Sequence, residues 1–334
     1  MINIIAEVGV NHGGSIALAH KYIDACAQTG ANYVKFQTWY PGEITGKYTE
    51  KAAYMQDGLG QELTRYDISN RLRIDHVYWA ELKAHADEVG IGFLSTPDGH
   101  RSLDFLVDNK LINCIKVGST EINNIPFLQH VNQIGLPVLL STGTATLSEV
   151  ASAVEIFQDR LDTLTLLQCT SSYPCPDDQL HLRVIPQYRT TFQCEVGFSD
   201  HSLGSIAAIA AVSLGASVIE KHVYIDSEVW TPDGKASQPY QEFKSLVSDI
   251  RRLELMLGSC YKHRTSSEVM NLDKIRRTLV ASSSLPSGHL LTSNDISIKR
   301  AKGGIDIRYL EAILGRRLSR DFSEDEPFEF TDFA

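Results

Sequence analysis

Short apolar runs alternate along the chain with segments in which apolar residues recur at helical spacing. Eight runs read as β-strands, at residues 2–10, 33–39, 91–97, 114–120, 137–143, 164–171, 194–200 and 217–224. Between them, residues 15–30 end in a glycine and residues 146–158 open with a Thr-x-x-Glu cap, as helices do. An open doubly wound sheet would have fewer strands and a glycine-rich nucleotide turn, so the pattern predicts a closed parallel (β/α)8 TIM barrel, an α/β fold.

The strand and helix pairs finish near residue 257, well before the end of the 334-residue chain. A barrel of about 250 residues therefore leaves room for one small additional domain. We expect a barrel at residues 1–257, a linker at 258–275 rich in Ser, Lys, Arg and Thr, and a small domain at 276–334.

Charge and composition narrow the class of protein. The formal net charge is −10 and no basic stripe is present, so we expect no nucleic-acid partner, although a local pocket for a small anion remains open. No apolar stretch approaches the roughly 18 residues of a membrane span, and a cytoplasmic protein is expected. The six cysteines are scattered without CxxC pairs, which favours reduced thiols over disulfides or a zinc site.

The predicted strands end in polar residues. Active sites of (β/α)8 barrels lie at the carboxyl ends of the strands, where such residues converge. Any one of them can be a hydrogen-bonded residue without a role, but all eight strands carry them: Glu7; Lys35 and Gln37; Ser95 and Thr96; Lys116, Ser119 and Glu121; Ser141; Ser171 and Tyr173; Ser199 and His201; Glu220 and His222.

Two kinds of chemistry follow from these residue types. His201 and His222, on adjacent strands, can hold a divalent metal that acts as a Lewis acid, or can serve as general acid and base without one. His12, after the first strand, is a third imidazole near the mouth. Lys35 and Lys116, with hydroxyl residues around them, suit a small phosphorylated anion.

Nine motifs, in order and spacing, resemble those of the sialic acid synthases: IIAEVGVNHGGS, VKFQT, FLSTP, IKVGSTEINN, LSTGTATLSEV, TSSYP, GFSDHSLG, VIEKH and PDGKAS. The segment SSEVMNLDKIRRTLVASSSLPSGHLLTSNDISIKRAKGGIDI is similar to that family's C-terminal antifreeze-like (SAF) domain. The resemblance implies a transferase that condenses phosphoenolpyruvate with an N-acyl hexosamine to a nonulosonic acid and releases phosphate. It also implies a domain-swapped homodimer.

The resemblance assigns roles residue by residue. His201 and His222 match ligands of Mn²⁺, Mg²⁺ or Co²⁺, and Glu121 matches a carboxylate that activates water; these three and Glu7 form the expected catalytic set. Six residues match the phosphoenolpyruvate site: Lys35, Thr96, Lys116, Ser119, Ser141 and Ser199. Ser171 is expected in the same site, at a position where the family has another residue. Five match the amino-sugar site: Glu7, Gln37, Tyr173, Asp233 and Arg300, the last reaching in from a neighbouring subunit.

The chain departs from the family pattern at three places, and alternatives stay open. Ser171 stands where the family has asparagine, TPDGKAS where it has GPDH, and KRAKG where it has KRPG, so the acceptor is either N-acetylmannosamine or a 2,4-diacetamido sugar. A Schiff-base aldolase using Lys116 or Lys221 is one alternative activity. A non-catalytic carbohydrate-binding protein is another, and the small domain could only stabilise a dimer, with Arg300 a surface charge.

Overall fold

The computed structural model describes residues 1–40, 42–43, 46, 49–50, 63–225 and 230–334. The chain divides into two compact units, Met1–Gly258 and Ser259–Ala334. Each unit has its own hydrophobic core and is described by itself.

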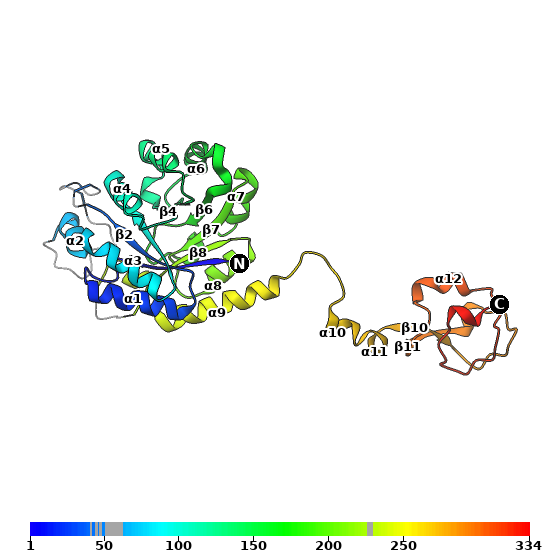
Figure 1. The fold of residues 1–334 in the computed structure, drawn as a ribbon. Coiled ribbons are helices and arrows are strands. Elements are labelled where there is room, and N and C mark those ends of the chain that lie inside the picture. The colour runs from blue at the N-terminus through cyan, green and yellow to red at the C-terminus, as the bar shows by residue number, and fades with distance from the viewer. Residues whose placement is uncertain (41, 44–45, 47–48, 51–62, 226–229) are drawn as a thin grey trace. The chain divides into compact units, whose positions relative to one another are not determined.

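The first unit is built on a parallel sheet of eight strands (Figure 1). They are β1 (Asn3–Gly9), β2 (Tyr33–Thr38), β3 (Gly92–Pro97), β4 (Ile115–Val117), β5 (Val138–Ser141), β6 (Leu164–Cys169), β7 (Glu195–Asp200) and β8 (Val218–Tyr224). The strand order is β3-β2-β1-β8-β7-β6-β5-β4, and the end strands β3 and β4 contact each other. The sheet is a nearly closed barrel, which confirms the predicted fold; a short strand, β9 (Gln238–Pro239), extends it beside β8.

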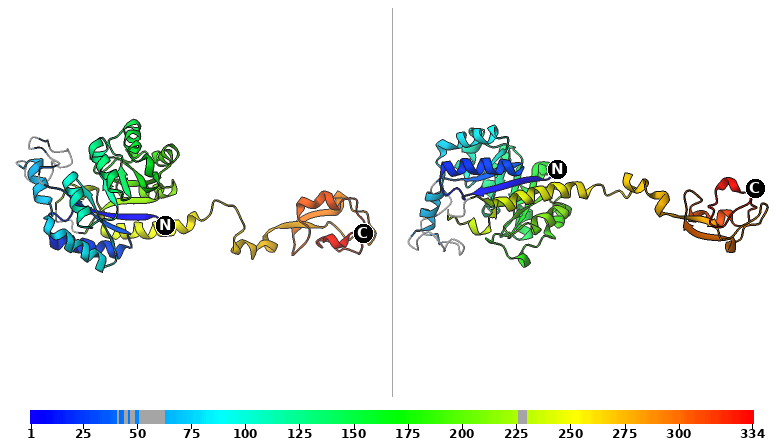
Figure 2. Two further views of the ribbon diagram at one scale, coloured as in Figure 1. Left: turned by 45° about the horizontal axis from the view of Figure 1, so that its top comes forward. Right: turned by 90° about the horizontal axis from the view of Figure 1, so that it is seen from below.

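Helices cover the outside of the barrel (Figures 1 and 2). They are α1 (Ile16–Thr29), α2 (Arg65–Leu72), α3 (Trp79–Glu88), α4 (His100–Asp108), α5 (Ile125–Ile134), α6 (Leu147–Glu155), α7 (Val184–Phe192), α8 (Ile206–Ser213) and α9 (Tyr240–Leu257). Helix α1 contacts both α3 and α9. Its ends follow the sequence signals: Ser15 accepts from Leu18 N–H, and Gly30 closes the helix at a φ of 81°. Thr146 and Glu149 form the predicted capping box of α6.

One apolar layer fills the inside of the barrel below the polar strand ends. Its buried members are Ile5, Leu94, Leu139, Leu167 and Val218. Side chains alternate along a strand, so the residue two positions later points into the barrel one layer higher. Those residues are Glu7, Thr96, Ser141, Cys169 and Glu220. The apolar layer therefore forms a floor, and the strand register places the polar groups directly above it.

The second unit contains an antiparallel pair of strands, β10 (Arg277–Ala281) and β11 (Ile296–Arg300). Three short helices accompany them: α10 (Ser266–Val269), α11 (Leu272–Ile275) and α12 (Leu310–Ile313). Its core includes Leu279, Leu291, Ile313 and Phe328. A module of this size with a core of its own fits the expected small C-terminal domain.

Other structural features bear on the expectations about thiols and membranes. All six cysteines are free; Cys26, Cys169, Cys175 and Cys194 are buried, and Cys260 is exposed. No helix in the described residues has both the length and the apolar character needed to cross a membrane.

Candidate active site

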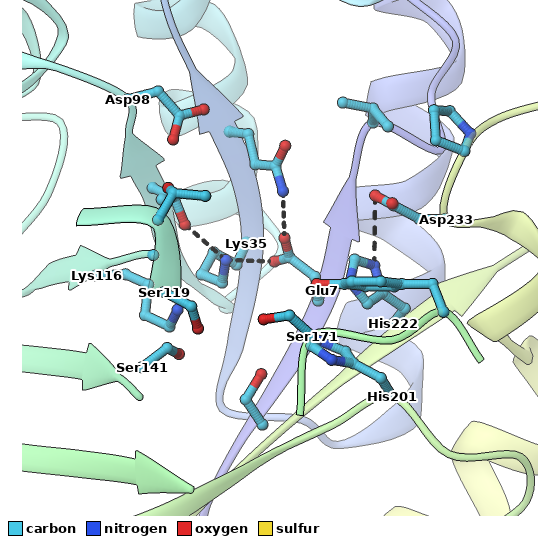
Figure 3. A pocket seen from close by; sticks show the side chains of 18 of the residues that line it. Glu7, Lys35, Asp98, Lys116, Ser119, Ser141, Ser171, His201, His222 and Asp233 are labelled. Carbon is cyan, nitrogen blue, oxygen red and sulfur yellow. Dashed lines mark hydrogen bonds and ion pairs between the residues drawn. The ribbon is translucent and has the colours of Figure 1, made fainter. Parts of the chain in front are cut away.

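A cavity of about 340 Å³ opens at the carboxyl ends of the strands (Figure 3). The residues predicted from the sequence to form the site line it, with the exception of Glu121 and Arg300: Glu7, Lys35, Gln37, Thr96, Lys116, Ser119, Ser141, Ser171, Tyr173, Ser199, His201, His222 and Asp233. Figure 3 shows Lys116, Ser119 and Ser141 on one side and His222 and Asp233 on the other, with Lys35 and Glu7 between them. The cavity thus has a cationic side and an imidazole side.

The two lysines are buried and connected through glutamates. Lys35 Nζ lies 2.7 Å from Glu7 Oε2 and donates to Thr96 Oγ1 at 2.9 Å. Glu220 joins the lysines, with Lys35 Nζ at 3.6 Å from one carboxylate oxygen and Lys116 Nζ at 3.5 Å from the other. These two distances exceed normal charge-assisted hydrogen bonds, so both ammonium groups keep capacity for another anion.

The two glutamates differ in their affinity for a proton. Burial raises the pKa of Glu7 to about 7, with Glu220 adding to the effect and Lys35 opposing it. Burial also acts to raise the pKa of Glu220, but Lys116 and Lys35 outweigh it, and with a hydrogen bond from Ser199 Oγ they lower it to about 2. Glu220 is therefore the permanent counter-ion of the lysines, whereas Glu7 can carry a proton near neutral pH.

Hydroxyl groups surround the lysines. Gly143 N–H donates to Ser119 Oγ at 2.9 Å, and the buried Ser141 Oγ has no hydrogen-bond partner in the described residues. A Cβ on Gly143 would lie 2.3 Å from Ser171 Oγ and 2.7 Å from Ser119 Oγ. Glycine at this position therefore leaves room for the hydroxyls of Ser119 and Ser171 beside the cations, where a phosphate or carboxylate can use them.

The two imidazoles fit a divalent metal. His201 and His222 have ring centroids 5.7 Å apart. Thr170 O accepts from His201 Nδ1 at 2.8 Å, which fixes that ring, and the buried Nδ1 of His222 has no hydrogen-bond partner among the described residues. Neutral imidazole nitrogens with one ring orientation fixed by a carbonyl are typical metal ligands. No group of three or more His, Cys, Asp or Glu side chains suited to a metal occurs in the described part of the chain, so His201 and His222 would be the side chains that hold such a metal.

Electrostatics separates the two histidines. Burial, together with His201 and Lys35, lowers the pKa of His222 well below its usual value. Burial also acts to lower the pKa of His201, but Cys169, the Thr170 carbonyl and Glu220 outweigh it and raise the pKa to about 9. A metal held by both would displace the His201 proton, because a ligand nitrogen must be unprotonated.

The segment that carries Asp233 is tied to the end of β1. Asn11 is buried there; its amide donates to Val223 O at 2.9 Å and Ser237 Oγ at 2.7 Å, and its oxygen accepts from Thr231 at 2.6 Å. Ser237 Oγ in turn donates to Asp233 O at 2.8 Å. The Asp233 carboxylate thereby comes to lie 3.9 Å from His222 Nδ1, and burial raises its pKa to about 6.

Gly9 makes this arrangement possible. Its φ is 54°, a left-handed conformation that glycine adopts readily. A Cβ at this position would come within 3.1–3.2 Å of Asp233, Glu7 and His222. Any larger residue would push apart the carboxylates and the imidazole.

Helix α2 forms part of the cavity wall. Its Ile68 and Leu72 pack with Val10 and Trp39, and Arg65 and Ser69 of the same helix line the cavity. The sequence does not indicate a role for these residues, because residues 39–64 separate the helix from the strand before it without a clear periodic pattern.

Three side chains that the sequence placed at the strand ends or the mouth do not line the cavity: Glu121, Ser95 and His12. Glu121 accepts from Asn124 Nδ2 at 2.6 Å. Arg300 belongs to the second unit, as expected, and its reach to a neighbouring subunit stays a prediction. Ser95 is buried and 2.7 Å from Thr38 Oγ1. His12 is buried against Phe36 with its pKa lowered by burial to about 4, so it is not a group at the mouth.

Asp98 and Cys169 line the cavity although no role was assigned to them from the sequence. The position of each residue in the sequence indicates that it faces the cavity. Asp98 lies two residues after Thr96 and so on the same side of the extended chain, and Cys169 lies two residues after the inward-facing Leu167. Counting alternate positions beyond the last polar residue would have found both.

Comparison with known proteins adds independent information. A model of the NeuB family matches residues 22–262, and a model of the SAF domain matches residues 276–334. The chain is 36% identical to an N,N'-diacetyllegionaminic acid synthase of Legionella pneumophila, over 96% of this chain and 91% of the relative. It is 35% identical to one of Campylobacter jejuni, over 97% of both chains.

A solved structure is also similar. The N-acetylneuraminic acid synthetase of Leptospira borgpetersenii, crystallised with citrate, superposes with a TM-score of 0.73 at 30% identity. The similarity covers 82% of this chain and 90% of that chain.

Proposed function

Because the chain belongs to the NeuB family and its barrel places two cationic lysines beside two imidazoles, we propose that it is a nonulosonic acid synthase. It condenses phosphoenolpyruvate with an N-acyl hexosamine to a sialic-type acid and releases phosphate. The single observation that carries the proposal is the two-sided cavity, with Lys35, Lys116 and hydroxyls on one side and His201, His222 and Asp233 on the other.

The cationic side suits phosphoenolpyruvate. Two ammonium groups share one fully ionised counter-ion, Glu220, so they retain positive charge for a phosphate and a carboxylate. The hydroxyls of Ser119 and Ser141 supply donors without added charge. Lys35 and Lys116 hold the anion in place, and that orientation is their contribution to the rate.

The imidazole side suits the carbonyl end of the open-chain sugar. His201 and His222 would hold a divalent metal, Mn²⁺, Mg²⁺ or Co²⁺. When bound, such a metal polarises a carbonyl oxygen as a Lewis acid. Glu7, with a pKa of about 7, and Asp233, with a pKa of about 6, can exchange protons with the hydroxyl groups of the sugar.

For the acceptor, we propose a 2,4-diacetamido hexose ahead of N-acetylmannosamine. Two relatives named N,N'-diacetyllegionaminic acid synthase are 35% and 36% identical to this chain over nearly its whole length. Helix α2 adds Arg65 and Ser69 to the wall, and these donors can bind an additional acyl oxygen. Arg300, in the SAF domain, completes the sugar site of a neighbouring subunit in a domain-swapped homodimer.

Phosphate release from phosphoenolpyruvate, measured with a panel of N-acyl hexoses and a divalent metal, tests the proposal. We expect release to depend on the sugar and to be fastest with a 2,4-diacetamido hexose. A borohydride trap distinguishes a Schiff-base aldolase, since this mechanism forms no imine on Lys116. A covalent adduct, or no phosphate release with any sugar, would disprove the synthase.

A further inference from the structure

Asp98 stands at the carboxyl end of β3, immediately after Pro97. Its backbone N–H donates to Thr38 O at 2.9 Å, which extends the strand pairing by one residue and fixes the start of its side chain. The side chain lines the cavity. Figure 3 shows it on the side of Lys116 and Ser119, across the cavity from Asp233 and His222.

The other carboxyl groups that line the cavity are occupied. Glu7 pairs with Lys35, and Glu220 pairs with both lysines and accepts from Ser199. Asp233 is held by a backbone hydrogen bond from Val10. No hydrogen bond or ion pair to the Asp98 carboxyl oxygens occurs within the described ranges of the chain. Asp98 is thus the carboxyl group of the cavity wall that can accept a proton on the side of Lys35 and Lys116.

Charged groups from several elements face Asp98. Glu121 follows β4 and Glu43 follows β2, and both act to raise its pKa; Lys35 and Lys116 act to lower it. Burial is the largest influence, and the net result raises the pKa of Asp98 to about 7. Asn124 Nδ2 holds Glu121 at 2.6 Å, and Glu43 accepts from Arg101 N–H at 2.9 Å, so both acidic neighbours are fixed in place.

We propose that Asp98 is the catalytic base that takes a proton from the attacking water, and that Glu121 is a positioning residue that acts through Asp98. The inference rests on the proposed synthase function. It assigns to Asp98 the water-activating role that the family resemblance gives to Glu121, because Asp98 lines the cavity and Glu121 does not.

The proton transfers balance as follows. After C3 of phosphoenolpyruvate bonds to the sugar carbonyl carbon, the sugar oxygen is an alkoxide and C2 is cationic. The water oxygen bonds to C2 while the Asp98 carboxylate takes one proton. The bond from C2 to the phosphate oxygen then breaks, and Asp98 returns that proton to the departing phosphate. The second water proton leaves the new hydroxyl as it becomes the keto group and goes to the sugar alkoxide.

Three variants in the full-length, metal-loaded protein test the proposal: Asp98→Asn, Asp98→Glu and Glu121→Gln. A matched control is Asp108→Asn, an exposed carboxylate at the end of α4. General-base catalysis contributes about 10²- to 10⁴-fold, so Asp98→Asn should lower kcat by that factor. The KM for phosphoenolpyruvate should change by less than about threefold, and Asp98→Glu should recover part of kcat.

The pH profile separates the two acidic residues. A base must be ionised, so kcat of the wild type should fall as the pH drops through about 7. Glu121→Gln removes a negative neighbour and lowers the Asp98 pKa, which moves this acid limb to lower pH. Asp98→Asn should lose the part of the limb that Asp98 causes, so that the remaining pH dependence comes from Glu7 and Asp233 and does not respond to Glu121→Gln.

The possible results distinguish the role of Asp98 from the synthase function. Full kcat in Asp98→Asn, or an unmoved acid limb in Glu121→Gln, overturns the role of Asp98 and leaves the synthase function standing. Loss of phosphoenolpyruvate binding in Asp98→Asn, measured by calorimetry, makes the residue part of the anion site and also overturns it. A wild type that releases no phosphate with any N-acyl hexose overturns the proposed function, and the role of Asp98 with it.

Discussion

Two buried lysines, Lys221 and Lys35, form ion pairs with carboxylates on opposite faces of the barrel wall, and the two ion pairs have different roles. Lys221, on the outward face of β8, is fully buried and lies 2.7 Å from both Asp200 Oδ2 and Ser202 O. Asp200 also accepts from Ser202 N–H at 2.9 Å and from its hydroxyl at 2.6 Å. Lys35, on the inward face of β2, has one close carboxylate and a second at 3.6 Å.

The two networks of polar groups differ in how completely they are paired. The outward network is closed, meaning that its groups bind one another, and the inward network is open, meaning that it contains groups without a partner in the described residues. Every strong donor and acceptor around Lys221 is used inside the protein, so this ion pair contributes to folding and leaves nothing for a ligand. In the inward network, Lys116 Nζ lies 3.5 Å from its carboxylate partner, and Ser141 Oγ has no partner in the described part of the chain. These groups keep hydrogen-bonding capacity that a ligand can use. The comparison also removes Lys221 as a Schiff-base candidate, because it does not line the cavity.

The largest effect should come from His201 and His222, the proposed metal ligands on the imidazole side of the cavity. Treatment with a chelator should abolish turnover, and Mn²⁺, Co²⁺ or Mg²⁺ should restore it. A Lewis acid contributes several kcal/mol, so His201→Ala and His222→Ala should each lose about a thousandfold in kcat. Bound metal, measured by plasma emission, should fall in the same variants.

The control for this experiment is His130→Ala, which removes an imidazole paired with Asp104 on the surface. It should keep both its metal and its activity. Full turnover by His222→Ala after chelation would mean that the open network works without a metal.

The next effect concerns stability and tests the closed network. Asp200→Asn leaves Lys221 buried with a neutral partner, which typically costs about 3–5 kcal/mol of unfolding free energy. Denaturant unfolding of residues 1–258 in the full chain, followed by tryptophan fluorescence, measures the loss. A change below about 1 kcal/mol would show that the outward pair is not structural.

Glu7→Gln is the contrasting variant. Folding raises the Glu7 pKa from its usual 4.5 to about 7, so ionised Glu7 destabilises the folded state above pH 7, and this cost disappears as the pH falls toward 4.5. The variant should therefore be more stable than the wild type at pH 8 and equal to it at pH 5. Equal loss of stability in Glu7→Gln and Asp200→Asn would contradict the distinction between the two networks.

A third test addresses the anion. Lys35→Met removes a charge-assisted contact of about 2–3 kcal/mol, which corresponds to a rise of ~30- to 150-fold in the KM for phosphoenolpyruvate. The KM for the sugar should change little. Lys244→Met, on the outer helix α9, is the matched control. An effect confined to the sugar would place the anion on the other side of the cavity.

Much of this site could be predicted from the sequence because the active site of a (β/α)8 barrel lies at the carboxyl ends of its strands. Glu7, Lys35, Thr96 and His222 could be placed together because each lies at the end of a strand run, and the alternation of side chains explains why they share the inner face. The same rule puts Glu220 and His222 inside and Lys221 outside, and applying it would have removed Lys221 from the alternatives at once.

The contacts that the sequence could not predict come from outside the strands. Arg65 and Ser69 reach the cavity because Ile68 and Leu72 dock on Trp39 and Val10, a packing that the hydrophobic periodicity of one short helix does not specify. The position of Glu121 outside the cavity lining could not be predicted for a related reason. The short 3-10 turn after β4 changes the direction of the chain, so strand parity no longer predicts where its side chain points.

The smallest expected effect concerns Arg300, a cation that is exposed, unlike Lys35 and Lys221. The register of β10 and β11 sets Arg277 directly opposite Arg300, and both side chains are exposed. Like charges across a strand pair are unfavourable, so an anionic or polar partner is needed to offset them. The formal charge of −10 resides in residues 1–258, because acidic and basic residues nearly balance in residues 259–334. A second copy of the barrel is therefore an electrostatically suitable partner for this pair.

If Arg300 completes the sugar site of a neighbouring subunit, Arg300→Ala should raise the KM for the sugar about tenfold, the effect of one exposed charge-assisted bond of roughly 1.4 kcal/mol. Arg300→Lys should not restore it, since an ammonium lacks the paired donors of a guanidinium. Binding of phosphoenolpyruvate should stay the same. Mixing Arg300→Ala subunits with His222→Ala subunits should recover activity, because half of the barrels in mixed dimers combine intact metal ligands with an arginine from the partner. No recovery after proven subunit exchange would mean that the arginine serves its own barrel or none, and that the exposed pair differs from the buried lysines in having no ligand.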